Sequence, residues 1–251
     1  MNIQVRRVEF NEVEGLRGLY REETNCRILY DSILPRGMAD PYLILVDGRV
    51  GGYGGAWNTT DSKGRVMEFY TLPGVRAAAL PMFRELLAVS GATGIEAQTD
   101  IPLLTLMLFD CARNVTSETL LFEDAVTTHL TCPDGVLRRN GPEDAPHISL
   151  QAREPVGDWR IEVGGTAVAT GGALFHYNPP FGDVYMEVAE PHRRRGYGSY
   201  LVQEIKRICY ETGKKPVSRC NISNVASRRT LQKAGFLPCA RLMVGEIAAR
   251  D

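Results

Sequence analysis

The sequence predicts an α/β protein with two mixed-sheet domains of similar design, the second shorter than the first. A hairpin pattern occurs twice, at Asp47-Gly48 and at Gly164-Gly165, each time between apolar runs and ahead of a Gly-Gly-Ala string. In both places a strand containing Met-Glu follows, and then an amphipathic helix. Because a shared order of elements is harder to obtain by chance than a short string, we interpret it as an internal duplication.

The first domain is expected over residues 1–139. Residues 3–8 predict a strand, and one or two helices are expected between residues 11 and 38. After the hairpin, a strand is predicted over residues 66–72. The next helix has an apolar stripe at helical spacing, made by Leu80, Phe83, Leu86 and Leu87. The Gly-rich run at 51–55 indicates a strand or bulge, since no helix begins after it.

The second domain is expected over residues 140–251 and opens on a segment rich in Gly, Pro, Asp and Glu, 140–158, typical of an exposed connection. A strand is predicted over 183–188, followed by a helix from Ser199 to about residue 212. The apolar face of that helix consists of Leu201, Val202, Ile205, Ile208 and Cys209.

Composition places the chain among folded soluble proteins, with 44% apolar and 24% charged residues. A net charge of -1 gives no general reason to bind nucleic acid or an anionic membrane. No apolar run approaches the roughly 20 residues of a membrane helix, and the first residues are not a signal peptide, so we expect a cytoplasmic protein. Nothing in the sequence indicates an oligomeric state.

The six cysteines are scattered and form no metal-like cluster with the four histidines, so no metal is expected and the thiols are expected to be reduced. Cys209 and Cys220 are assigned structural roles. His192 is expected to be an ordinary exposed histidine. Trp57 and Trp159 are interpreted as core or rim residues, with ligand stacking as the lesser alternative.

The clearest functional signal is the turn Arg-Arg-Arg-Gly-Tyr-Gly at residues 193–198, between a strand and a helix. The first N–H groups of a helix lack internal partners, and the macrodipole adds roughly half a positive charge there. Gly196 and Gly198 let the backbone approach phosphate oxygens, and the arginines can add charge-assisted hydrogen bonds. The turn therefore predicts a phosphate site, with a solvated helix start as the alternative.

Together with Asn-Val-Ala-Ser at 224–227 and Leu-Gln-Lys-Ala-Gly-Phe at 231–236, this turn resembles the GCN5-related N-acetyltransferase (GNAT) family, over about residues 183–240. The resemblance implies a tandem form with a degenerate first copy. It implies acetyl-CoA or another acyl-CoA as co-substrate, no metal, and transfer of an acetyl group to the amine of a small molecule. The first copy lacks the glycine pair at 73–76, so it is expected to bind pyrophosphate poorly and to serve as a scaffold.

The resemblance also implies the cofactor-binding positions. The strand edge that pairs with the pantetheine arm falls on Val188, Ala189 and Glu190. The turn that holds the pyrophosphate falls on Arg193, Arg194, Arg195, Gly196, Tyr197, Gly198 and Ser199. Asn224 falls on the polar residue that opens the next helix and touches that arm, and a plain helix N-cap is its equal alternative.

The catalytic base is assigned to Glu187, because an amine with a pKa near about 10 must lose a proton before it attacks. The alternation of Met186 and Val188 would instead turn Glu187 to an opposite, solvated face, and Glu190 is the second candidate. A backbone N–H near Val188 is expected to stabilise the oxyanion if the strands splay.

One position departs from the family pattern. Leu231 stands where many members have a tyrosine that protonates the thiolate, which leaves Tyr197 or a water for that role. A non-catalytic acyl-CoA-binding module, or a transferase for longer acyl chains or protein amines, therefore stays open. The loop at 178–182 is a further candidate for lining the acceptor pocket.

Overall fold

The computed structural model describes residues 1–24, 33–59, 62–144, 156–176 and 179–247. Cys26, most of the 140–158 connection and Asn178 lie outside the described residues. The described residues form two compact units, one made of residues up to 118 and from 240 on, the other of residues 119–239. The helices of the described ranges are all too short or too polar to cross a bilayer.

The first unit begins with β1 (Ile3–Arg7) and α1 (Phe10–Thr24). Its remaining elements up to residue 111 are β2 (Ala39–Val46), β3 (Arg49–Trp57), β4 (Arg65–Thr71), the 3-10 helix η2 (Pro73–Ala78), α2 (Ala79–Ser90), β5 (Gly94–Gln98) and α3 (Pro102–Cys111). Hydrogen-bonded neighbours follow the order β1-β2-β3-β4-β5-β12, where β12 is Phe236–Ile247. Only β4 and β5 pair in parallel in the ladders described for this sheet.

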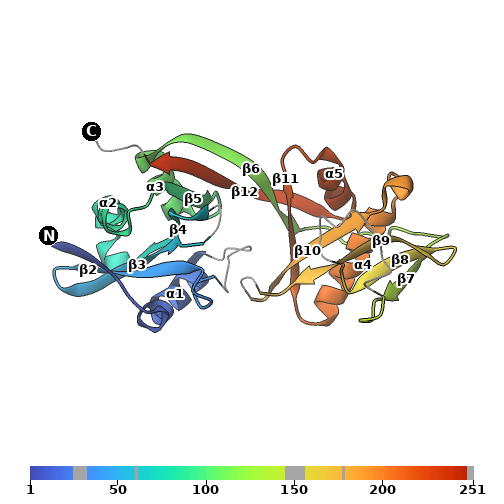
Figure 1. Cartoon of the computed structure of the whole chain (residues 1–251), viewed down its shortest axis with the longest axis horizontal. Coiled ribbons are helices and arrows are strands. Elements are labelled where there is room, and N and C mark those ends of the chain that lie inside the picture. Colours follow the sequence, from blue (N-terminus) through green and yellow to red (C-terminus); the bar gives the residue numbers. More distant parts are fainter. Residues whose placement is uncertain (25–32, 60–61, 145–155, 177–178, 248–251) are drawn as a thin grey trace. The chain divides into compact units, whose positions relative to one another are not determined.

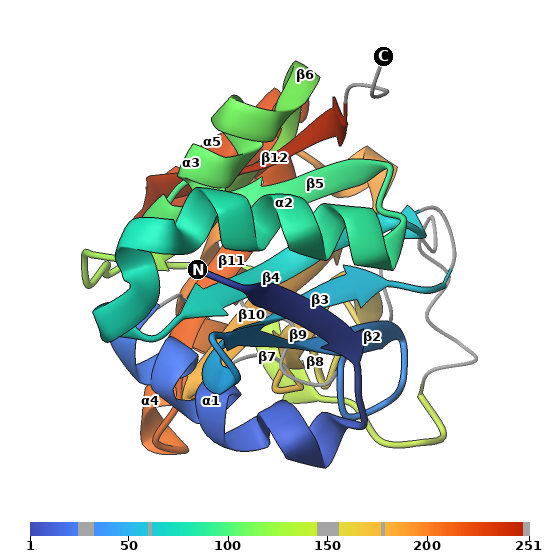
Figure 2. The ribbon, with the colours of Figure 1, turned by 90° about the vertical axis from the view of Figure 1, so that its left-hand side faces the viewer.

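Helices cover both faces of this first sheet. Phe69 of β4 packs against Phe83 of α2, with ring centroids 4.8 Å apart, so this side chain marks the α2 face. Its neighbour Glu68 points to the opposite face, where it meets Arg17 of α1. Figure 1 shows α1 on one side of these strands and α2 with α3 on the other, and in Figure 2 α2 crosses in front of β4 and β5.

The second unit contains β6 (Ala112–Asp124), β7 (Val136–Arg139), β8 (Trp159–Val163), β9 (Thr166–Leu174), β10 (Phe181–Val188), the 3-10 helix η4 (Glu190–His192), α4 (Tyr197–Glu211), β11 (Lys215–Asn221) and α5 (Val225–Lys233). Hydrogen-bonded neighbours follow the order β6-β11-β10-β9-β8-β7. The core under α4 includes Val184, Leu201, Val202 and Ile205, and Met186 and Val188 pack against it.

The same order of elements occurs twice along the chain. The series β2, β3, β4, η2, α2, β5, α3, β6 is matched by β8, β9, β10, η4, α4, β11, α5, β12. The last strand of each series pairs with the other series: β6 with β11, and β12 with β5. The boundaries between the compact units therefore lie within β6, at 118/119, and within β12, at 239/240. The sequence-based boundary at 139/140 instead divides the chain into two consecutive segments.

The two predicted hairpins are confirmed. Asp47 and Gly48 have φ of 48° and 76°, and Gly164 and Gly165 have φ of 57° and 79°. Two consecutive residues with positive φ are what a two-residue hairpin turn with the right-handed strand twist requires. The helix predicted from Ser199 begins two residues earlier, at Tyr197.

Candidate functional site

Strands β10 and β11 pair over only part of their length. Their parallel register runs from Phe181↔Lys215 to Asp183↔Val217. Beyond this point β11 continues along β6, with Ser218 opposite Phe122, while β10 continues along β9 to Val188. From residue 184 on, one edge of β10 therefore faces an opening between diverging strands.

The backbone groups that face this opening follow from strand alternation. The carbonyl of Val184 accepts a 2.7 Å hydrogen bond from Ser218 Oγ, and the carbonyl of Val188 accepts one of 3.2 Å from Arg193 Nε. The N–H of Ala189 donates to Val168 on the β9 side at 2.9 Å. Because successive residues of a strand direct their backbone groups to opposite neighbours, the N–H groups of Met186 and Val188 face the opening.

The turn before α4 has the geometry of an anion cradle. Arg194 and Gly196 have φ of 62° and 93°, and Gly196 is the N-cap residue of a 15-residue helix. Gly196 has no side chain with which to cap this end, so the first N–H groups of α4 can bind water or a ligand. A Cβ at Gly196 would point into open space, with Lys233 Nζ its nearest neighbour at 4.0 Å.

Charge around this cradle is positive. Arg193, Arg194 and Arg195 are exposed at its rim. Lys233 adds a fourth cation beside Gly196. The sequence motif contains this residue, but no role was assigned to it. Its place in the Lys-x-Gly-Phe string was the signal that could have identified it. An anion held by the helix N-terminus would therefore lie in a positively charged environment.

Gly198 is required for a different reason. A Cβ there would lie 3.1 Å from Val188 Cγ2 and 3.2 Å from Thr230 Cγ2. These contacts are tighter than ordinary van der Waals packing, so the absent side chain lets α4 lie close to β10 and α5. The two glycines therefore have different roles: Gly196 leaves space beside the helix start, and Gly198 allows close packing of α4. The sequence pattern alone did not distinguish these roles.

Tyr197 anchors the turn and is not available as an acid. Its side chain is 2% exposed, and its hydroxyl donates a 2.6 Å hydrogen bond to Asp134 Oδ2. This bond raises the pKa of Tyr197 and lowers the pKa of Asp134 below its usual value. His192, expected to be exposed, is half-buried, with its ring centroid 6.4 Å from that of Tyr197.

Glu187 is buried on the face of β10 opposite α4. Its neighbours Met186 and Val188 pack under α4, so the alternation noted in the sequence holds. The face is not solvated, however, because Glu187 is only 9% exposed. It lies in register with Thr170 of β9. Glu190, the second candidate base, is exposed at the start of η4.

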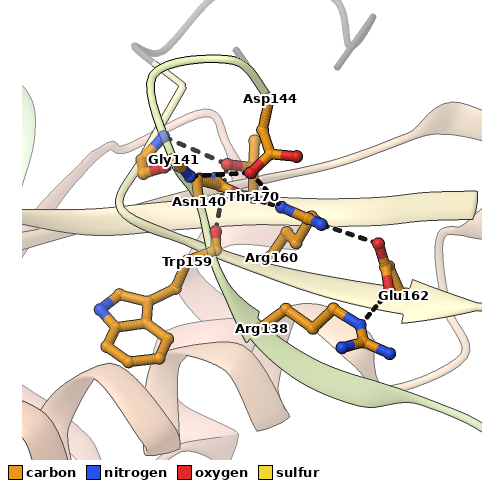
Figure 3. A network of polar contacts seen from close by, with 9 residues as sticks. Arg138, Asn140, Gly141, Asp144, Trp159, Arg160, Glu162 and Thr170 are labelled. Atoms are coloured by element: carbon orange, nitrogen blue, oxygen red, sulfur yellow. Dashed lines mark hydrogen bonds and ion pairs between the residues drawn. The ribbon is translucent and has the colours of Figure 1, made fainter. Parts of the chain in front are cut away.

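The cations nearest to Glu187 in the register are already paired. Arg160 lies opposite Thr170, and it binds Asp144 at 3.0 Å and Glu162 at 2.9 Å. Arg138, opposite Arg160 on β7, pairs with the same Glu162. Figure 3 shows this network holding the chain around residues 140–144 onto β8. This network is structural, and strand β9 lies between it and Glu187.

Asn224 and Leu231 have clear structural roles. Asn224 accepts a 3.0 Å hydrogen bond from the N–H of Ser227, which confirms it as the N-cap of α5. Its side chain is exposed, so the same residue can present its amide group to a ligand. Leu231 is 2% exposed and belongs to the core under α4.

The two cysteines that were assigned structural roles, Cys209 and Cys220, are buried. Cys209 is 1% exposed, and burial raises its pKa to about 11. Burial likewise raises the pKa of Cys220. No group of His, Cys, Asp and Glu side chains able to hold a metal ion occurs in the described part of the chain.

Comparison with protein families identifies the region that holds these features. The model of the Acetyltransferase (GNAT) family matches residues 124–236, which include β10, the turn, α4, β11 and α5. Residues 124–236 form a GNAT domain. No curated protein matches the chain in sequence.

Solved structures share the fold of the GNAT domain and of the residues before it. An acetyltransferase of the GNAT family from Colwellia psychrerythraea superposes with a TM-score of 0.78 at 16% identity, covering 98% of this chain and 100% of that one. A tandem GNAT protein from the clavulanic acid biosynthesis pathway gives 0.59 at 14% identity, with full coverage of both chains. A GCN5-related N-acetyltransferase from Sphaerobacter thermophilus gives 0.59 at 15%, covering 99% and 97%. At these identities the likeness concerns the fold.

GNAT proteins generally use acetyl-CoA, and the residues of this GNAT domain fit its diphosphate. The fit rests on the uncapped α4 N-terminus, the open space at Gly196 and the surrounding cations. The family match therefore supports acyltransferase chemistry in general terms.

Proposed function

We propose that the GNAT domain transfers an acetyl group from acetyl-CoA to the amine of a small molecule. The proposal rests on the N-terminus of α4, which has no side-chain cap and follows β10 in the chain. The free edge of β10 borders the opening between β10 and β11. Acetyl-CoA would supply an activated thioester carbonyl.

The turn would hold the diphosphate. The N–H groups from Arg194 to Ser199 and the cations of Arg193 and Lys233 are suited to phosphate oxygens. Arg193 also donates to the carbonyl of Val188, so it ties the turn to the strand edge. The edge N–H groups of Met186 and Val188 remain to donate to the arm of the co-substrate and to the oxyanion.

Glu187 would take the proton from the amine. Its carboxyl is buried and lies one residue before Val188, on a strand fixed between β9 and the opening. This carboxyl is shielded from bulk water, and no arginine binds it among the described residues. For this reason Glu187 is preferred to Glu190, which is exposed.

A second function has a specific observation in its favour. Leu231 occupies the position where the family commonly has an acidic tyrosine, and the hydroxyl of Tyr197 is bound to Asp134. A domain with no group to protonate the thiolate would suit an acyl-CoA-binding module without turnover. A thiol with a pKa near about 8.5 is, however, a tolerable leaving group without an acid.

The test is release of free CoA thiol from acetyl-CoA with a panel of amino acids and other small amines. Turnover with one of them supports the proposal. Tight CoA binding measured by calorimetry, with no turnover for any amine, favours the binding module. Turnover that requires a longer acyl chain, or a protein amine, would replace the proposed substrates.

A further inference from the structure

A cavity of about 360 Å³ lies in the second unit, between the carboxyl-terminal half of α4 and the strands β7, β8 and β9. Ile205 and Cys209 of α4, 2% and 1% exposed, form part of its floor, with Ala173 of β9 in its wall. The volume falls at the small end of the range for ligand sites, about 300–1,000 Å³. The space is therefore suited to a single small molecule.

Two aromatic rings border the cavity. Trp159 lies in register with Gly171, and Figure 3 shows its indole turned toward the helix, away from Arg160. Phe175 is 47% exposed although it lines the cavity, and its ring packs on Gly182, where a Cβ would approach Phe175 Cε1 to 2.6 Å. Because both rings line the same cavity, a planar ligand there can contact aromatic surface from β8 and from the residue after β9.

The charge at the cavity is mainly positive. Arg139 and Lys214 line it, and neither has an ion-pair partner among the described residues. Lys214 Nζ lies 6.0 Å from the centroid of the Phe175 ring. The exposed Asp158 is the opposing charge in the lining. Two cations against one carboxylate favour a ligand with an anionic group.

We infer that this cavity binds a small aromatic carboxylate, with its ring between Trp159 and Phe175 and its carboxylate at Lys214 and Arg139. A carboxylate bound by ammonium and guanidinium groups forms charge-assisted hydrogen bonds, while the apolar floor takes the ring. The inference is independent of the proposed transferase reaction.

This site is separate from the acyl-CoA turn and from Glu187. Trp159 and Ala173 lie on the α4 face of the sheet, whereas Glu187 lies on the opposite face. Gly196 and Cys209 stand at opposite ends of α4, about 20 Å apart at 1.5 Å per residue. A molecule in the cavity is therefore not the acceptor amine and does not compete with CoA.

The experiment uses the full chain and three isosteric probes: 2-naphthoate, 2-naphthylmethanol and 2-naphthylmethylammonium, titrated by calorimetry. We expect 2-naphthoate to bind about tenfold more tightly than the alcohol, and the ammonium to bind least. Saturating CoA should leave the naphthoate affinity unchanged. The inference is overturned by absent naphthoate binding, by equal or better binding of the other probes, or by displacement of naphthoate with CoA.

Two variants locate the binding. Ala173→Leu fills the cavity from β9 and should abolish naphthoate binding, with folding checked by circular dichroism. Lys214→Glu, at a half-exposed position that should not disturb folding, should weaken it about tenfold. Arg113→Glu is the matched control, an exposed charge reversal in the first unit that should change nothing. Unchanged affinity in Lys214→Glu overturns the inference even if Ala173→Leu does not fold.

Discussion

Glu68 on β4 and Glu187 on β10 stand at the same step of the repeated order of elements, and their surroundings differ. Glu68 is fully buried and receives hydrogen bonds from Arg17 Nη2 at 2.9 Å, from Arg17 Nε at 3.0 Å and from the hydroxyl of Tyr53 at 2.8 Å. Among the described residues, no arginine or tyrosine binds Glu187 in this way. The first copy uses the carboxylate in a structural ion pair, whereas Glu187 of the second copy has no such partner among the described residues.

The segments that follow β4 and β10 also differ between the two copies. In the first copy η2 replaces the glycine turn, and Arg76 is bound to the carbonyl of Thr71 at 2.7 Å and to Glu23. In the second copy the turn contains Arg194 and Gly196, both with positive φ, and α4 begins directly after Gly196. This difference supports our expectation that the first copy binds pyrophosphate poorly. Substitutions at Arg17, Glu187, Gly196 and Asp134 test how the two copies differ.

Arg17→Met should have the largest effect. It leaves the carboxylate of Glu68 buried without a counterion, which should lower the free energy of unfolding of the first unit by about 3–5 kcal/mol in urea titration. The double variant Arg17→Met with Glu68→Met removes both charges and should recover most of that loss. A single variant within about 1 kcal/mol of the parent would show that this pair is not a structural requirement.

Glu187→Gln should separate chemistry from stability. We expect the rate of acetyl transfer to fall about a hundredfold, as is typical for loss of a general base. CoA affinity and the unfolding midpoint should change little, because Glu187 makes no ion pair with another described residue. Equal rates for parent and variant across pH would remove Glu187 as the base.

Gly196→Val should weaken CoA binding at least about tenfold, or about 1.4 kcal/mol. A β-branched residue is strained at a φ of 93°, and its side chain would enter the open space where phosphate is expected. Gly74→Val is the matched control in the first copy, where φ is not positive and a Cβ meets nothing within 4 Å. Calorimetry should show a loss only for Gly196→Val. An unchanged affinity in a folded variant would contradict the phosphate site.

Asp134→Asn should have the smallest effect, since this carboxylate is exposed. The bond from Tyr197 lowers the pKa of Asp134, so its contribution to stability is present above the unfolded pKa of about 3.9 and is lost as pH falls below it. The urea midpoints of parent and variant should therefore differ at pH 6 and converge as the pH falls through the lowered pKa of Asp134 in the folded protein. A difference that stays constant over this range would mean that the carboxylate charge is not what matters.

Local features of the fold were predictable from the sequence. The hairpins follow from glycines that accept positive φ, and the α4 helix from apolar residues at helical spacing. The phosphate turn was also visible, because its groups lie within six consecutive residues. Contacts between residues close in the sequence depend little on the rest of the chain, so local structure of this kind can be predicted from the sequence.

Other features required the tertiary structure. Leu231 and Gly198 have roles set by packing between α4, α5 and β10. Tyr197 looked free to act as an acid, but it donates to a residue 63 positions away. Lys233 and the cavity beside Trp159 likewise arise from elements that the chain brings together only on folding.

The repeated order of elements, the hairpin turns and the glycine-containing helix start follow from local backbone preferences and side-chain period. The pairing of β6 with β11 and of β12 with β5, and the contact of Glu68 with Arg17, 51 residues away, depend on long-range packing. Identical Met-Glu patterns in two strands have the same local preferences. Their charges differ in role because distant residues supply a partner in one copy and, in the described part of the chain, none like it in the other.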